Sequence, residues 1–349
     1  MEGGRSEILL VALGGNALIR KGEIGTIDEQ FANLQVPISQ IARLSRDYRI
    51  IITHGNGPQV GNLLLQQECC DEVPRMPLEI LVAQTQGAIG YMIESTLDSE
   101  LMRQGIAVNK PLVSLISYVV VDEKSPGFLR RTKPIGPVFS EERALKLGYP
   151  TRKTEKGYRR VVASPDPVTI VEKNEIKKLM DMDFIVICCG GGGIPVVREG
   201  RSFAGVDAVI DKDLASARLA SEVGVDIFII ATDVEGVALS YGRPDQRFLR
   251  QLTAGQAGRY REEGHFPEGS MLPKIRAAVL FLSSGGKRAV IASISAIEDA
   301  VAGRAGTEIT LDNEVRLGKA TLFRNETTQQ MSGAEKQVED RKFTQVERH

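Results

Sequence analysis

Apolar residues along this chain follow two patterns, one continuous and one with helical spacing. Largely apolar runs lie at residues 8–13, 50–53 and 185–189, and each ends in a segment that contains at least two glycines. Such runs are typical of strands that are buried on both faces of a parallel sheet. Residues 27–47 instead carry apolar side chains at helical spacing, which predicts a helix with one face on the sheet. The order strand, helix, strand predicts a βαβ unit with a right-handed crossover, and therefore a mostly parallel sheet.

Further apolar segments continue this α/β pattern as far as residue 311. Strands are predicted within 111–122 and at 184–188, 226–231, 288–292 and 307–311. Helices are predicted at 78–103, near 168–180, from 207 to about 223, and at 267–282. Helix 78–103 has a second apolar stripe in addition to the one that packing on a sheet requires. That stripe contains Ile80, Ala83, Tyr91 and Leu101 and leaves two interpretations open, a contact with a second copy of the chain or deep burial inside a monomer.

Two segments depart from the α/β pattern. Residues 123–160 are polar and rich in proline, glycine, lysine and arginine, which predicts an excursion from the core whose basic residues mostly cover surface. The sequence beyond Asp312 lacks any apolar period and is predicted to be a disordered tail. The chain length permits one large domain or two over residues 1–312, with the excursion at about 123–160, followed by the tail over 313–349.

The charge and hydropathy of the chain favour a small-molecule ligand. Its 44 lysines and arginines nearly balance its 45 aspartates and glutamates, so no broad field attracts nucleic acid or a membrane surface. No apolar run approaches the roughly 20 residues of a membrane span, and the amino terminus carries no apolar signal region. We expect a soluble, cytoplasmic protein.

Cysteines and histidines do not form a recognisable catalytic or metal-binding pattern. The four cysteines occur as two adjacent pairs, at 69–70 and 188–189, whereas zinc ligands usually have a gap of two to four residues. Adjacent cysteines in a strand point to opposite faces, so reduced thiols are the better interpretation. Only His54 and His265 lie within the predicted fold, which makes a serine–histidine triad improbable.

The glycine segments after the strands indicate an anion-binding edge. Gly14 and Gly15 lack Cβ atoms, so their backbone N–H groups can approach a phosphate closely. Loops at the carboxyl ends of parallel strands meet at one edge, where ligands bind. In the second loop, Pro58 suits the first position of a helix and leaves the amides of residues 55–57 facing an anion. The glycine spacing of this loop approaches a dinucleotide fingerprint, which requires an acidic residue at the end of a second strand about twenty positions on. Here residues 73–77 (VPRMP) lead instead into a helix, which argues against nicotinamide binding.

Three lysines are placed where a phosphate would need them. Lys133 lies in a proline-stiffened turn, which positions its charge at lower entropic cost. Lys212, between two aspartates, lies in the opening segment of the helix predicted from residue 207, where a cation is unfavourable unless an anion is near. Lys274 follows a proline in a later helix. Backbone donors combined with lysines suit phosphoryl transfer, in which the protein mainly positions reactants and neutralises oxygens.

Taken together, these segments resemble the carbamate kinases of the amino acid kinase family. The matching segments are VALGGNA (11–17), HGNGPQVGN (54–62), TQG (85–87), TKPIGP (132–137), CGGGGIPV (189–196), AVIDKD (208–213), GHF (264–266) and GSMLPK (269–274). The resemblance runs from about Ile8 to Leu311. The second loop, which begins with a histidine, the Lys133 turn and the Lys274 motif are similar to carbamate kinases in particular.

The resemblance implies one domain, a three-layer α/β/α sandwich around a mainly parallel sheet of about eight strands, with a small protruding lobe. It also implies a homodimer that catalyses ATP + carbamate ⇌ ADP + carbamoyl phosphate with Mg²⁺, often toward ATP during arginine fermentation. The protein ligands of the Mg²⁺ stay unknown.

The same resemblance implies roles for individual residues. Carbamate and the transferring phosphoryl group would be held by Gly14, Gly15, Asn16, Gly55, Asn56 and Gly57. Lys212 and Lys274 would neutralise the phosphates, Lys133 would reach in from the lobe, and Asp213 would orient the lysines. The nucleotide would lie near Gly191, Gly192, Asp233, Gly269, Ser270 and Met271.

Departures from the family pattern are few, and two alternative functions stay open. Tyr158 stands where a tryptophan is expected, Cys189 where a serine is common, and the tail has no counterpart. One alternative is another amino acid kinase that acts on glutamate, aspartate or a nucleoside monophosphate. The other is a regulator that binds a carboxylate or a nucleotide without catalysis, although the presence of all three lysines argues against it.

Overall fold

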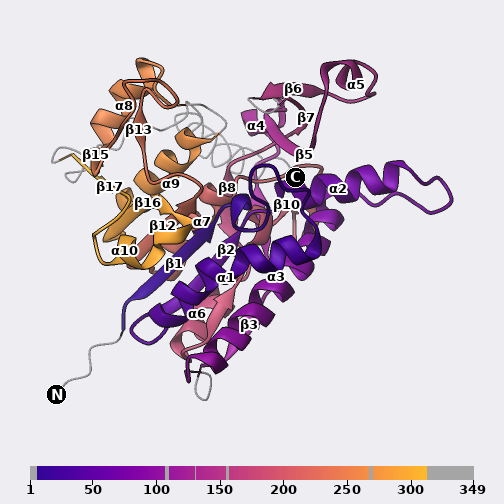
Figure 1. Ribbon diagram of the computed structural model, residues 1–349. Coiled ribbons are helices and arrows are strands. Elements are labelled where there is room, and N and C mark those ends of the chain that lie inside the picture. Colours follow the sequence, from indigo (N-terminus) through magenta and orange to yellow (C-terminus); the bar gives the residue numbers. More distant parts are fainter. Residues whose placement is uncertain (1–5, 107–109, 130, 155–156, 267–269, 313–349) are drawn as a thin grey trace, which may run out of the picture.

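An eight-stranded sheet forms the centre of the molecule (Figure 1). The computed structural model describes residues 6–106, 110–129, 131–154, 157–266 and 270–312. In spatial order the strands are β15 (Gln251–Thr253), β17 (Thr307–Thr310), β16 (Arg288–Ser293), β12 (Ile227–Thr232), β1 (Ile8–Leu13), β2 (Arg49–His54), β9 (Ile185–Ile187) and β3 (Leu112–Ser114). All neighbours are parallel except β16 and β17, which confirms the predicted mostly parallel sheet.

Helices cover both faces of this sheet, so the predicted three-layer architecture is confirmed. The odd-numbered residues of β1 lie in one core with α1 (Ile27–Leu44), α3 (Leu78–Arg103) and α10 (Ile297–Val301). Its even-numbered residues lie in the other core with α6 (Lys173–Asp181), α7 (Lys212–Val223), α8 (Ala254–Glu262) and α9 (Met271–Ser283). Because successive side chains of a strand point to opposite faces, a continuous apolar run is what such a strand requires.

Smaller sheets accompany the central one. A four-stranded sheet has the order β11 (Ser202–Gly205), β10 (Ile194–Glu199), β4 (Tyr118–Val121), β8 (Pro167–Ile170). A three-stranded sheet has the order β5 (Lys133–Phe139), β7 (Gly157–Val162), β6 (Thr151–Thr154), and it stands with α4 (Pro126–Leu129) and α5 (Glu141–Leu145) at the top of Figure 1. A short pair joins β13 (Ala238–Leu239) and β14 (Arg247–Phe248), and α2 (Gly57–Glu68) lies below the three-stranded sheet.

One predicted helix was wrong over its first part. Residues 167–170 form β8, an edge strand that pairs antiparallel with β4, and α6 begins only at Lys173. Val168, Thr169 and Ile170 are β-branched, and a proline is tolerated at the first position of an edge strand, so local propensity favours the strand here.

Other predicted boundaries also shift. Helix α1 ends at Leu44 and not at Asp47, and α7 begins at Lys212, after Asp211 caps its first turn. The predicted strand within 111–122 divides into β3 and β4, which belong to different sheets. Helix α9 begins at Met271; residues 267–269 and the predicted tail over 313–349 lie outside the described residues. Within the described ranges, no helix combines the length and hydrophobicity needed to cross a membrane.

Candidate active site

Two glycine loops meet at the carboxyl edge of the central sheet. The N–H group of Gly14 donates to the carbonyl of Ala231 at 2.9 Å, and that of Gly55 to the carbonyl of Leu13 at 3.0 Å. A Cβ atom built on Gly55 would lie 3.2 Å from the nitrogen of Gly15. The loops after β1 and β2 therefore touch through their backbones, as expected for strands that are parallel neighbours. Asn16 lies in the short 3₁₀ helix 15–17 and is half-buried.

A third glycine loop, at residues 190–193, closes over Asn56. The Asn56 side chain is buried, and its Nδ2 donates to Oγ1 of Thr85 at 2.8 Å. Gly191 has a φ of +66°, and a Cβ atom there would lie 2.1 Å from Nδ2 of Asn56. A side chain at residue 191 would thus displace Asn56. The family resemblance implied that Asn56 lies at the substrate and Gly191 at the nucleotide, and the structure brings the two residues into direct contact.

The predicted lysines gather around two aspartates at the start of α7. Nζ of Lys212 lies 3.2 Å from the carbonyl oxygen of Ala12 and 2.6 Å from Oδ1 of Asp213. Nζ of Lys274 lies 2.9 Å from Oδ2 of the same carboxylate. Nζ of Lys133 lies 2.5 Å from Oδ2 of Asp211. When all five groups are ionised, three ammonium groups against two carboxylates leave one net positive charge at the end of β1.

The groups of this cluster are buried, and burial and the neighbouring charges together shift their pKa values. Only 9% of the surface of Lys212 and 3% of that of Asp213 is exposed. Burial alone would raise the pKa of Asp213, but the nearby Lys212 and Lys274 more than offset it and hold that pKa well below its usual range. Burial lowers the pKa of Lys212, against the opposing effect of Asp213. Burial also acts to lower the pKa of Lys274, but Asp213, Asp211 and Asp233 together raise it above the usual value.

Asp211 is a member of the cluster to which the sequence analysis assigned no role. It caps α7, where its Oδ1 accepts the N–H of Asp213 at 2.9 Å, while its other oxygen holds Lys133. The available signal was an aspartate in the opening segment of the predicted helix, because aspartate is a favoured N-cap residue. Its partner Lys133 is 78 residues away in sequence, so the ion pair itself had no local signal.

His54 is buried between the loops and is electrically neutral at neutral pH. Burial lowers its pKa to about 4, Lys212 acts in the same direction, and its Nδ1 lies 3.2 Å from the carbonyl oxygen of Gly55. A Cβ atom on Gly190 would lie 2.3 Å from Nε2 of His54. The ring therefore fills space between two loops.

The residues predicted to bind the nucleotide lie on three separate segments and do not form one cluster as the lysines do. Gly192 is buried beside Ile210, next to the lysine cluster. Asp233 follows β12, is exposed, and contributes to the raised pKa of Lys274. Ser270 precedes α9 and Met271 begins it, one turn before Lys274. Gly269 lies outside the described residues.

Comparisons with known proteins show which family has this fold. The model of the amino acid kinase family matches residues 7–293. The chain is 46% identical over 311 residues to the carbamate kinase of Thermococcus kodakarensis, covering 86% of this chain and 98% of that protein. A carbamate kinase from Giardia lamblia bound to citric acid superposes with a TM-score of 0.82 at 38% identity, covering 88% of this chain and 99% of that one. The same enzyme bound to AMP-PNP gives 0.79 at 39% identity with the same coverage. This chain therefore belongs to the amino acid kinase family.

Proposed function

We propose that this protein is a carbamate kinase that catalyses ATP + carbamate ⇌ ADP + carbamoyl phosphate. The observation that supports it best is the buried cluster of Lys212, Asp213 and Lys274 at the carboxyl end of β1, beside the glycine loops. Carbamate kinase relatives that match nearly their full length agree with this assignment.

The cluster supports direct, in-line transfer of the phosphoryl group. Phosphoryl transfer spreads charge over the equatorial oxygens, and catalysis consists mainly of positioning and charge stabilisation. Lys212 is fixed by Ala12 and Asp213 before substrate arrives, so its charge needs no reorganisation at the moment of reaction. In this proposal Asp213 orients Lys212 and Lys274, and Lys133 approaches the same oxygens from the three-stranded sheet.

The glycine loops supply the remaining contacts in this proposal. The N–H groups of Gly14 and Gly55 already donate to the sheet, so these two glycines would serve by leaving space for the ligand beside the backbone. Carbamate and the transferring group would be held by the backbone N–H groups of Gly15 and Gly57 and by the Asn16 and Asn56 side chains. The nucleotide would lie by Gly191, Gly192, Asp233, Gly269, Ser270 and Met271. The AMP-PNP complex of the Giardia lamblia enzyme supports a nucleotide site in this fold.

Mg²⁺ is the proposed cofactor, bound with the nucleotide. Among the residues that the structure describes, no three His, Cys, Asp or Glu side chains gather into a metal cage. Asp211 and Asp213 already pair with lysines. Mg²⁺ is commonly held by substrate phosphates with one or two carboxylates, so the nucleotide would supply most of its ligands. When bound, the ion neutralises phosphate charge, and the roles proposed above for the protein's own groups do not depend on its position.

Homodimer formation is a further part of the proposal. Helix α3 exposes Ile80, Tyr91 and Met102, the last two to 65% and 59%, so one of its faces is partly apolar. Leu101, which the second predicted stripe included, is buried. A second copy would cover this face, and sedimentation velocity measures the resulting mass. Placement in the cytoplasm and in arginine metabolism stays a prediction.

One assay tests the function. Purified protein is incubated with ADP, Mg²⁺ and carbamoyl phosphate, and ATP is followed by a coupled luciferase reaction. We expect rapid ATP formation. ATP consumption with glutamate, aspartate or a nucleoside monophosphate, and none with carbamate, would identify another amino acid kinase. Nucleotide binding without turnover on any of these substrates would favour the regulator.

A further inference from the structure

Helix α2 and strand β5 meet at a point where each contributes a glycine, Gly61 from the helix and Gly136 from the strand. A Cβ atom built on Gly61 would lie 1.8 Å from Cα of Gly136 and 2.0 Å from its nitrogen. Gly136 itself has a φ of +73°, a conformation that disfavours other residues. Because the atoms that approach are backbone atoms, no change of side-chain rotamer can make room for a methyl group.

This contact lies between the glycine loop after β2, which leads into α2, and strand β5, which begins with Lys133. Helix α2 begins at Gly57, and a Cβ atom there would lie 3.9 Å from the carbonyl oxygen of Pro134. Between the two contacts, Ile135 is fully buried against Val60 and Leu64 of the helix. The first residues of β5 therefore lie along α2, and Lys133 extends from the end of that contact.

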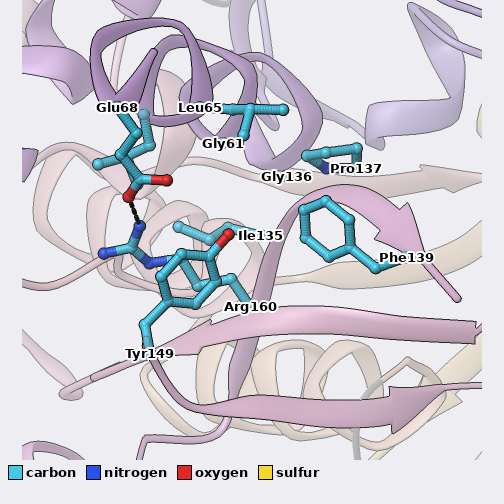
Figure 2. A pocket seen from close by; sticks show the side chains of 10 residues that line it. Gly61, Leu65, Glu68, Ile135, Gly136, Pro137, Phe139, Tyr149 and Arg160 are labelled. Carbon is cyan, nitrogen blue, oxygen red and sulfur yellow. Dashed lines mark hydrogen bonds and ion pairs between the residues drawn. The ribbon is translucent and has the colours of Figure 1, made fainter. Parts of the chain in front are cut away.

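Two arginines of β7 support the same arrangement. Nε of Arg159 donates to the carbonyl oxygen of Gly136 at 3.0 Å. Arg160 forms an ion pair with Glu68 at the far end of α2, and its guanidinium lies 4.1 Å from the centre of the Tyr149 ring. Figure 2 shows Gly61 facing Gly136 and Arg160 reaching Glu68 across the small crevice between helix and sheet. The three-stranded sheet therefore contacts α2 at two places, Gly136 against Gly61 and Arg160 against Glu68, and Arg159 holds Gly136 in position within the sheet.

We propose that Gly61 and Gly136 are positioning residues for Lys133. Their contact sets the separation of β5 from α2, and with it the place where the Lys133 ammonium group meets Asp211 and the phosphoryl oxygens. The proposal rests on the proposed function. Neither glycine needs to touch substrate, because a shift of about 1 Å in a catalytic group can by itself lower the rate by about 100-fold.

The test is a double-mutant cycle of Gly61→Ala with Lys133→Ala. In the otherwise unchanged protein, we expect Gly61→Ala to lower kcat/KM for carbamoyl phosphate by about tenfold or more. The KM for ADP should stay within about twofold. In the Lys133→Ala background, the further loss should be below about twofold, because residues that act through one group are not additive.

Gly148→Ala is the matched control. Gly148 is exposed in the same lobe, and a Cβ atom there would have no neighbour within 4 Å. This variant should match the unchanged protein in both backgrounds. An equal loss from Gly61→Ala with and without Lys133, or no loss at all, would overturn the proposal.

Two further measurements separate this proposal from the proposed function and from misfolding. Reductive methylation of Lys133, read by mass spectrometry, should be faster in Gly61→Ala than in Gly148→Ala whether or not the protein turns over carbamoyl phosphate. A methylation rate of Lys133 that is the same in Gly61→Ala and Gly148→Ala would reject the positioning role. Failure of the protein without substitutions to make ATP would reject the proposed function alone.

A second variant covers the case in which Gly61→Ala does not fold. Arg159→Met removes the donor to Gly136 without adding an atom there. Its loss of activity should also disappear in the Lys133→Ala background, and a loss that persists would contradict the proposal.

Discussion

At the scale of single residues, Lys212 is a cation at a helix start, where the helix dipole favours an anion. Lys212→Met keeps the aliphatic stem and removes the charge, so turnover should fall by about 10²–10³-fold, the usual effect of losing a preorganised donor. The melting temperature should change little, because Lys274 still pairs with Asp213. Steady-state kinetics and thermal melting check both expectations.

Lys212→Arg is the control for charge alone. It should restore only part of the activity, because a planar guanidinium cannot place its charge where the compact ammonium group did. Near-native turnover in Lys212→Met would remove this lysine from the mechanism and leave it as an ordinary helix-start residue.

Asp211 has two separable tasks, capping α7 and holding Lys133. Asparagine is an equally good N-cap, so Asp211→Asn should keep the melting temperature while it lowers kcat/KM for carbamoyl phosphate about as much as Lys133→Ala does. Asp211→Ala should in addition lose about 1 kcal/mol of stability, since the cap is gone. Equal melting temperatures for the alanine and asparagine variants would show that the cap contributes nothing.

At the scale of elements, strand β5 brings Lys133 from the three-stranded sheet to Asp211, the N-cap residue of α7. We propose that it meets the phosphoryl donor and not the adenine. Lys133→Ala should therefore weaken the use of carbamoyl phosphate and leave ADP affinity nearly intact, as measured by initial rates and calorimetric titration. Equal losses for both ligands would count against a substrate-side role.

At the scale of the whole molecule, the sequence beyond Asp312 is predicted to be a tail that the domain does not need. Residues 325–349 lie outside the described residues, and their composition offers too little apolar surface to dock. A chain shortened at residue 324 should keep the melting temperature and turnover of the full chain. A large loss of either would place the tail in the dimer or in the site.

The sequence by itself determined the features that depend on neighbours along the chain. The unbroken apolar run of β1, the glycines that follow it and the helical spacing of α1 are local patterns, so the mostly parallel α/β sheet was predicted correctly. Edge strand β8 was misread although its β-branched residues favour a strand, because four residues just before helix α6 are too few for periodicity to separate strand from helix.

Only the tertiary structure decided which distant residues meet. Asp211 with Lys133, Asn56 with Gly191 and Gly61 with Gly136 are pairs far apart in the sequence. No local spacing encodes such a contact, because it arises when separate elements pack on the same sheet and their backbones close to a fixed distance. The three lysines and Asp213 could therefore be singled out from the sequence and its family resemblance. The pairing of Lys133 with Asp211, and the contact between Gly61 and Gly136, required the fold.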